Sequence, residues 1–321
     1  MTAGLESRLD CIACLTRQAH EAVVSATTDT HLRENALRGS LRLLTRLDWH
    51  QSPPALALRI HRFIRDATNN PDPYAEVKDQ LNRRAALLEP TWHKRLAEAF
   101  PPFEAAVRMA IFGNLLDVAA KTKLGEADVD AAFGHALTAP LMGSAQELQD
   151  AIASARHILY LADNAGEIVF DRGLLSLLPL GRFTVVVRGG PVLNDATLAD
   201  ARWAGLQDFC DVMANGSDVP GTILKECSLE FRTLFAAADL IIAKGQGNYE
   251  SLAGINKHIF FLLKIKCDVL AQDLGWPLGS LVLHHQRPAG GNHPRPRRES
   301  SALWLEERGP RPRSNQPPTR T

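Results

Sequence analysis

The chain has 321 residues, of which 45% are hydrophobic, and its 36 Lys and Arg residues equal its 36 Asp and Glu residues in number. This length can hold one large or two medium domains with a sizeable core. The balanced charge argues against a global field that would attract nucleic acid, so we expect no nucleic-acid partner. The first residues do not resemble a signal peptide, and no apolar run approaches the roughly 20 residues that span a bilayer. We therefore expect a cytoplasmic protein without a membrane partner.

The N-terminal segment carries two of the five cysteines, Cys11 and Cys14, in a predicted helix over residues 9–25. Five scattered cysteines are unlike a disulfide framework, so we expect reduced thiols. Two thiols three residues apart on a helix face the same way and could bind a metal or act as a redox pair. Two small buried side chains at a helix start are the alternative, and the sequence leaves both open.

Residues 1–150 are predicted to form an all-helical region. Apolar residues recur every three or four positions, with charged residues between them, in the segments 31–47, 53–69, 74–88, 91–100 and 103–118. In the last segment, Asn114 and Asp117 would share one face of a helix amid apolar neighbours, where polar groups need partners. They are candidates for a second layer of residues around a site; alternatively, Asp117 pairs with an arginine such as Arg108 or is solvated.

Beyond residue 150 the pattern predicts an α/β domain over residues 151–283, because short apolar strands alternate with helical segments. Strands are expected in the segments 156–162, 183–188, 209–213, 239–243, 258–264 and 269–272. Residues 284–321 are rich in Pro and Arg, and such a composition cannot bury enough apolar area to offset its ordering entropy. We expect this tail to be disordered.

Small and polar residues follow four of the predicted strands. Asp163-Asn164-Ala165-Gly166-Glu167 follows the first, Arg188-Gly-Gly-Pro-Val-Leu-Asn194-Asp195 the second, a turn with Asn215 the third, and Lys244-Gly245-Gln246-Gly247-Asn248 the fourth. In open α/β sheets, ligands bind at the carboxyl ends of strands, where helix N-termini offer unpaired N–H groups. Each turn alone is also ordinary helix-capping or tight-turn chemistry. Their occurrence at successive strand ends favours a site.

The oxygen atoms of Asp163, Asn164 and Asp195 suit a hard divalent cation such as Mg²⁺ or Mn²⁺, and no His accompanies them, which argues against zinc. Glu167 or Asp195 would orient or deprotonate a water molecule. Lys244 would neutralise an anion that small residues allow close to the backbone. The candidate phosphate-binding residues are Lys244, Gly245, Gly247, Asn248, Asn194, Asn215 and Arg188.

Together these motifs resemble the metal-dependent damage-control phosphatases, also named for acidic residue methyltransferase and formerly a domain of unknown function. Cys11-x-x-Cys14 and Gly113-Asn114-x-x-Asp117 make the chain similar to the prokaryotic branch, over about residues 5–283. The resemblance implies a helical N-terminal region packed on a three-layer α/β/α Rossmann-like sandwich. It also implies a divalent metal (Mn²⁺, Mg²⁺, Co²⁺ or Ni²⁺) on Asp163, Asn164 and Asp195. The implied reaction is hydrolysis of phosphate monoesters of small metabolites, such as sugar phosphates or phosphopantetheine-type compounds.

Two other functions are compatible with the sequence. An S-adenosylmethionine-dependent carboxyl methyltransferase is one, although a nucleotide-binding fingerprint has more glycines after its first strand than this chain has. A non-catalytic protein that binds phosphorylated metabolites is the other. A dehalogenase-type phosphoenzyme is disfavoured, because its second acid would stand where this chain has Ala165. The oligomeric state is not predicted.

Overall fold

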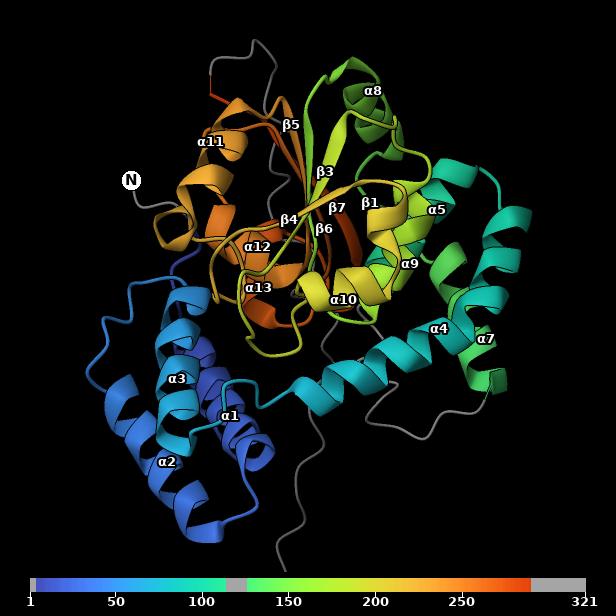
Figure 1. Cartoon of the computed structure of the whole chain (residues 1–321). Helices are drawn as coiled ribbons and strands as arrows, with labels where there is room; N and C mark the ends of the chain where they lie inside the picture. Colours follow the sequence, from blue (N-terminus) through green and yellow to red (C-terminus); the bar gives the residue numbers. More distant parts are fainter. Residues whose placement is uncertain (1–3, 114–125, 290–321) are drawn as a thin grey trace, which may run out of the picture. The chain divides into compact units, whose positions relative to one another are not determined.

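The computed structural model describes residues 4–113 and 126–289 (Figure 1). Asn114 and Asp117, the residues predicted to lie in a second layer around the site, fall outside these ranges, as does most of the predicted tail. The division of the chain into domains at residues 150 and 283 stays a prediction. Among the described helices, none is long and apolar enough to cross a membrane.

The first three helices form a bundle with a core of its own, and they are α1 (Leu9–Ala26), α2 (Thr30–Leu44) and α3 (Pro53–Thr68). Asp29 caps α2, because its carboxylate accepts the N–H groups of His31 and Leu32. Proline opens α3, where its missing N–H costs nothing, and Asn69 ends it in the left-handed conformation with φ of 49°. Asn69 therefore fixes the residue at which α3 ends.

Three further helices continue the N-terminal region: α4 (Ala75–Glu98), α5 (Pro102–Phe112) and α7 (Glu126–Thr138). The segments 74–88 and 91–100 were expected from their spacing, and they join into the single helix α4 with Pro90 inside it. Packing compensates for the hydrogen bond that proline removes, since Trp92 is fully buried against Phe170.

Within the described residues, seven strands form one sheet with the order β1-β7-β6-β5-β2-β3-β4, in which only β6 and β7 pair antiparallel. The strands are β1 (Leu141–Met142), β2 (Ile158–Leu161), β3 (Phe183–Val187), β4 (Asp211–Ala214), β5 (Leu240–Lys244), β6 (Ile259–Lys264) and β7 (Leu281–Gln286). From β2 the chain moves outward through β3 and β4, then returns to β5 on the other side of β2. The strand order therefore reverses beside β2, which is where α/β sheets open a ligand-binding crevice.

Helices cover both faces of this sheet (Figure 1). Ile158 and Tyr160 of β2 belong to a core shared with α4, α5 and α9, whereas Leu159 and Leu161 belong to a second core shared with α11 and α12. Strands buried on both faces read as continuous apolar runs, as these do. The helices of this part are α8 (Ala145–Ser154), α9 (Glu167–Leu175), α10 (Leu198–Trp203), α11 (Leu229–Ala237), α12 (Gly245–Leu252) and α13 (Asp268–Leu274).

The α/β class and its helical N-terminal region are confirmed, and three local predictions are wrong. Residues 269–272 lie in α13 instead of a strand, because a short apolar run suits a buried helix equally well. The two-residue strand β1 lies inside the region predicted to be all helical. Strand β7 extends to Gln286, past the predicted start of the tail, since His285 stacks on Phe260 and the Gln286 side chain bonds to a backbone carbonyl.

Candidate functional site

Three side chains predicted to bind metal lie together beside β2. Asp163 and Asn164 follow β2, Asp195 follows β3, and a short antiparallel bridge joins Asn164 to Asp195. Two backbone hydrogen bonds of 2.8 Å secure this bridge, from Ala165 N–H to the Asn194 carbonyl and from Ala196 N–H to the Asp163 carbonyl. The ends of two neighbouring parallel strands thus carry all three oxygen-bearing side chains into one buried place.

Two glycines with positive φ allow this close packing. Gly166 has a φ of 74°, and its N–H donates to Oδ1 of Asn82 on α4 at 2.7 Å. Gly245 has a φ of 78°, and a Cβ atom there would lie 1.9 Å from Oδ2 of Asp163. Gly245, which the sequence suggested as a phosphate contact, therefore also makes room for the Asp163 carboxylate.

Acidic groups gather around the predicted metal ligands. Burial raises the pKa of Asp163 well above its usual range, the charges of Glu167 and Asp195 raise it further, and Arg188 and Lys266 oppose them. Two carboxylates and an amide oxygen, buried beside a third acid, are the donor set that a hard divalent cation prefers. The residues present therefore fit the metal that the sequence predicted.

The side chain of Asn164 is held by two acids. Its Nδ2 group donates to Oδ2 of Asp163 at 2.9 Å and to Oε2 of Glu167 at 3.0 Å. Glu167, the first residue of α9, is almost completely buried. The structure places the Glu167 carboxylate against Asn164 and Lys244, and its predicted action on water stays a prediction.

Lys244 ends β5 with a side chain that is 0% exposed. Its Nζ lies 2.5 Å from Oε1 of Glu167 and 2.5 Å from Oδ1 of Asp171 on α9. Burial alone would lower the pKa of Lys244, but the charges of Asp171 and Glu167 raise it above its ordinary value. The residues after Lys244 were expected to form a loop and instead begin α12. In this structure, then, the lysine faces two acids and is enclosed by them.

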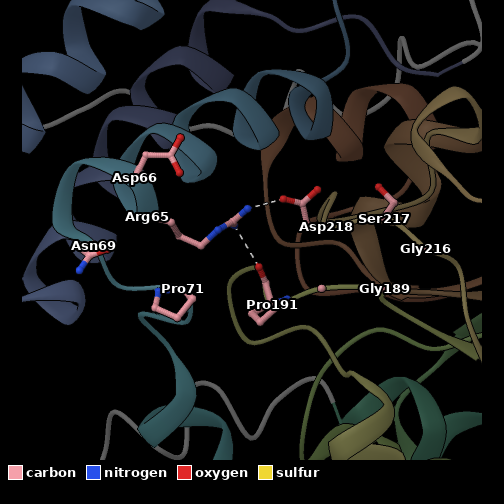
Figure 2. Close-up of a pocket in the computed structure, with 10 residues that line it drawn as sticks. Arg65, Asp66, Asn69, Pro71, Gly189, Pro191, Gly216, Ser217 and Asp218 are labelled. Atoms are coloured by element: carbon pink, nitrogen blue, oxygen red, sulfur yellow. Dashed lines mark hydrogen bonds and ion pairs between the residues drawn. The ribbon is translucent and has the colours of Figure 1, made fainter.

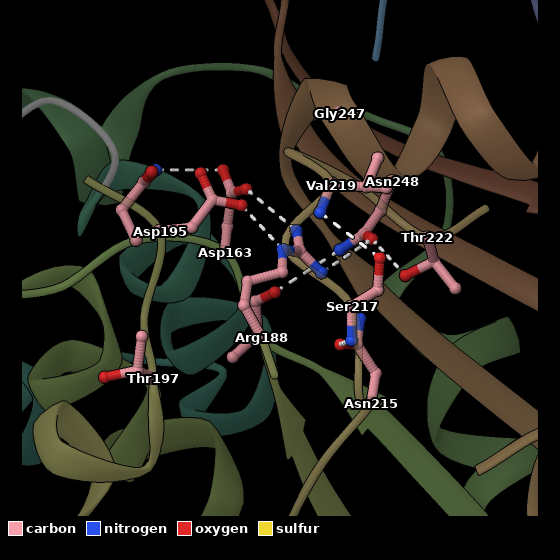
Figure 3. A network of polar contacts seen from close by, with 12 residues as sticks. Asp163, Arg188, Asp195, Thr197, Asn215, Ser217, Val219, Thr222, Gly247 and Asn248 are labelled. Atoms are coloured by element: carbon pink, nitrogen blue, oxygen red, sulfur yellow. Dashed lines mark hydrogen bonds and ion pairs between the residues drawn. The ribbon is translucent and has the colours of Figure 1, made fainter. Parts of the chain in front are cut away.

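Arg188 directly follows β3 and is 2% exposed. Figure 3 shows its side chain among the polar residues of the site. Its Nε donates to Oδ2 of Asp195 at 2.6 Å, and its Nη1 donates to Oδ1 of Asn248 at 3.3 Å. Its Nη2 lies 3.8 Å from Oδ1 of Asp163 and makes no hydrogen bond to any described residue. A buried guanidinium donor without a hydrogen bond, beside the predicted metal ligands, is suited to a phosphate oxygen.

Other predicted phosphate-binding residues brace the same network. Oδ1 of Asn215 accepts the N–H groups of Gly189 and Ser217 at 3.0 and 2.9 Å, while its buried Nδ2 makes no hydrogen bond within the described ranges. Asn248 donates to the Lys244 carbonyl at 2.8 Å and accepts from Thr222. Gly247 packs so closely on the Pro220 carbonyl that a Cβ atom would lie 2.3 Å from it.

A cavity with a volume of about 610 Å³ lies beside this network. Figure 2 shows the residues that line it. One wall is the end of α3, and the other is formed by the segments that follow Arg188 and Asn215; the lining residues are Arg65, Asp66, Asn69, Pro71, Gly189, Gly190, Pro191, Gly216, Ser217 and Asp218. Arg65 connects the walls, because it pairs with Asp218 and donates to the Pro191 carbonyl at 3.0 Å. Sequence reasoning missed Arg65, Asp218 and Asp171, since their partners are more than 70 residues away along the chain.

The CxxC pair gains no further support as a metal site. Cys11 is buried and Cys14 is exposed. No group of three or more His, Cys, Asp or Glu side chains within residues 4–113 and 126–289 is arranged to hold a metal ion. Asp163 and Asp195 accordingly need the amide of Asn164 to make a set of three.

Comparison with known proteins identifies the family of this chain. The model of the damage-control phosphatase ARMT1-like domain matches residues 8–282. The chain belongs to this family. A damage-control phosphatase of Pyrococcus horikoshii is 34% identical over 288 residues, covering 87% of this chain and 97% of that protein. A damage-control phosphatase of Archaeoglobus fulgidus is 34% identical over 284 residues, covering 85% of this chain and 96% of that protein.

The family is also supported by a solved structure. The crystal structure of a DUF89 family protein from Pyrococcus horikoshii superposes with a TM-score of 0.82 at 31% identity, covering 88% of this chain and 100% of that one. The resemblance given by the sequence motifs is therefore confirmed. The relatives' names support a phosphatase role for this member of the family.

Proposed function

We propose that this protein is a metal-dependent phosphatase that hydrolyses phosphate monoesters of small, damaged metabolites, such as sugar phosphates or phosphopantetheine-type compounds. The observation that carries this proposal is the buried Nη2 donor of Arg188, which lies 3.8 Å from Asp163 and makes no hydrogen bond to the described residues. The oxygen-rich site would bind the positively charged metal. The unsatisfied guanidinium donor would bind the negatively charged phosphate.

Asp163, Asn164 and Asp195 would hold the metal, which is Mn²⁺, Mg²⁺, Co²⁺ or Ni²⁺. When bound, the metal supplies Lewis-acid stabilisation of the phosphoryl oxygens and lowers the pKa of a bound water. Arg188 neutralises charge that develops on the phosphoryl group, and its bond to Asp195 fixes the plane of the guanidinium. Asp195 orients the attacking water.

The cavity beside Arg188 would receive the alcohol part of the substrate. Its volume of about 610 Å³ is suited to a small metabolite. Backbone groups of Gly189, Gly190 and Gly216 line it, so a polar, hydroxyl-rich substrate finds hydrogen-bonding partners there. We also propose a cytoplasmic location, since the described cysteines are free thiols, and no nucleic-acid or membrane partner.

A phosphate-release screen tests this function. Metal-stripped protein is assayed against sugar phosphates and cofactor phosphates with each of the four cations. Asp163→Ala is expected to lower metal-stimulated phosphate release by at least about 100-fold, because it removes one of three ligands. The matched control is Asp239→Ala, which removes a carboxylate that accepts backbone N–H groups at the opposite end of the sheet; it should retain activity.

Three outcomes would overturn the proposal. Undiminished phosphate release by Asp163→Ala would exclude this metal site. Binding of phosphorylated metabolites without any phosphate release would indicate a non-catalytic binding protein. Tight binding of S-adenosylmethionine in a calorimetric titration, with no phosphatase activity, would indicate the methyltransferase.

A further inference from the structure

We propose that Asp171, Lys244 and Glu167 form a buried ion chain that orients the side-chain amide of Asn164, so that its Oδ1 faces the metal. These three are positioning residues, because they act on the metal site through Asn164. This proposal rests on the metal site of the proposed function, and it extends that site to residues on α9 and β5.

The first step concerns which way the amide of Asn164 points. Its nitrogen faces Oδ2 of Asp163 and Oε2 of Glu167, at 2.9 and 3.0 Å. With a cation on Asp163 and Lys244 on Glu167, both carboxylates are ionised and only accept hydrogen bonds, so an amide oxygen in that place would be repelled by both acids. Both hydrogens of Nδ2 are thereby used. Oδ1, the only atom of this side chain that binds a hard cation, is directed away from the two carboxylates.

The second step concerns what holds Glu167. One oxygen of its carboxylate accepts from Asn164, and the other accepts from Nζ of Lys244 at 2.5 Å. Asp171, one turn later on α9, accepts from the same Nζ at 2.5 Å. Lys244, Glu167 and Asp171 are each at most 1% exposed. Lys244 therefore separates two acids that would otherwise repel each other, and it fixes the rotamer of the acid that bonds to Asn164.

The third step concerns the phosphate contact expected of Lys244. Its Nζ has three N–H donors, of which Glu167 and Asp171 accept two. Moving Nζ away from these acids toward an anion would break buried ion pairs, which is strongly unfavourable. Arg188 already provides a buried donor without a hydrogen bond among the described residues. We therefore assign different roles to the two basic residues. Arg188 faces the substrate, whereas Lys244 holds Glu167, the acid that orients Asn164.

A single isosteric change tests the chain. In Glu167→Gln, the ammonium of Lys244 attracts the new amide oxygen, so the new amide nitrogen faces Nδ2 of Asn164. Two donors then oppose each other. The Asn164 amide either turns over, taking Oδ1 away from the metal, or loses its bond. We expect the calorimetric Kd for Mn²⁺ to rise about 10- to 100-fold, as loss of such supporting partners does elsewhere.

A rescue variant separates orientation from folding. Glu167→Gln with Asp171→Asn and Lys244→Met leaves no charge in the chain, so the glutamine side chain that replaces Glu167 is free to offer its oxygen to Asn164. The Kd of the triple variant for Mn²⁺ should be at least about tenfold lower than that of Glu167→Gln. A merely structural role would predict the reverse, since three buried substitutions disturb packing more than one does.

The matched control is Glu250→Gln, a buried acid on α12 whose carboxylate accepts a hydrogen bond from Gln246. It should leave the Mn²⁺ affinity unchanged. Thermal unfolding of each metal-free variant reports whether it folds. Inorganic phosphate, used as a competitive inhibitor, reports anion binding: its inhibition constant in the rescued triple variant should stay within about threefold of the wild-type value, because Arg188 is intact.

The outcomes distinguish this proposal from the proposed function. If wild-type protein binds Mn²⁺ and Glu167→Gln binds it equally well, the orienting role is wrong and the phosphatase assignment stands. If the triple variant binds Mn²⁺ no better than Glu167→Gln, the role is also wrong. If it regains Mn²⁺ but its phosphate inhibition weakens about tenfold or more, Lys244 contacts phosphate. If wild-type protein binds no divalent cation, both proposals fail.

Discussion

The carboxyl ends of β3 and β5 flank the same central strand, and each places a buried cation beside two acids: Asp163 and Asp195 for Arg188, Glu167 and Asp171 for Lys244. Arg188 after β3 keeps one nitrogen without a hydrogen bond to the described residues, whereas Lys244 at the end of β5 is enclosed by Glu167 and Asp171. Two basic residues at equivalent places in a sheet can thus differ in whether they are available to a ligand. What distinguishes them is the position of α9, which carries both Glu167 and Asp171 toward Lys244.

The largest expected effect is on stability, in Lys244→Met. This change leaves two buried carboxylates without their cation, which costs about 3–5 kcal/mol of unfolding free energy. Urea denaturation of the metal-free protein measures it. Added Mn²⁺ should recover little of this loss, because neither Glu167 nor Asp171 belongs to the predicted ligand set. Full recovery by Mn²⁺ would show that the two strand ends do not differ in this way.

Arg188→Met should act mainly on catalysis. Removing a donor that stabilises developing charge typically lowers kcat about 10²- to 10³-fold. Its acidic neighbours are the proposed metal ligands, so Mn²⁺ should restore stability to this variant, in contrast to Lys244→Met. Phosphate-release kinetics and denaturation with and without Mn²⁺ test both parts. A variant with near-normal kcat would assign the phosphate contact elsewhere.

A pH dependence is expected from Glu250, on the helix that follows β5. Burial raises its pKa to about 7, and the bond from Gln246 only partly opposes this; Cys11 and Cys267 are its titratable neighbours. The folded-state pKa exceeds the unfolded value of about 4.3, so the stabilisation is complete below that value and is lost as the pH rises through about 7. Glu250→Gln should therefore be more stable than wild type at about pH 9, by about 3 kcal/mol, and urea denaturation should show a flatter stability profile between about pH 5 and pH 9.

The smallest effect is expected at the cavity wall, in Asp218→Asn. Arg62 and Arg65 hold the pKa of Asp218 below its usual range despite partial burial, and both lose an ionic partner in this variant. The Arg62 side chain is 42% exposed to solvent, so we expect a stability loss of only about 1 kcal/mol. KM should rise a few-fold with kcat unchanged, because Arg65 then no longer connects the two walls. An equal fall in kcat would place Asp218 closer to the reaction than the structure does.

The sequence allowed the fold class and the location of the candidate site to be predicted for a physical reason. Parallel strands bring their carboxyl ends to one edge, so Asp163 and Asp195 can be placed together from strand positions alone. The partner of Lys244 could not be predicted in this way, because the direction of Asp171 depends on how α9 packs on the sheet. A signal was present, since Glu167 and Asp171 are four residues apart and share a helix face.

Arg65 shows a second limit. Nothing local in α3 indicates that its last turn faces the segments after β3 and β4, because that contact spans more than 120 residues. The segment 269–272 shows a third limit, since its apolar residues are compatible with a buried helix as well as with a strand. In each case tertiary packing decides what the local pattern leaves open.

The backbone bridge between Asn164 and Asp195 has a thermodynamic consequence. Two peptide hydrogen bonds hold in register the segments that carry the proposed metal ligands, so the proposed binding arrangement is fixed by the backbone and does not depend on a cation. Little conformational entropy would then be lost when a cation arrives. The amides of Ala165 and Ala196 should exchange slowly with deuterium even after chelation, and metal exchange should be limited by the departure of the ion, with the loops staying folded.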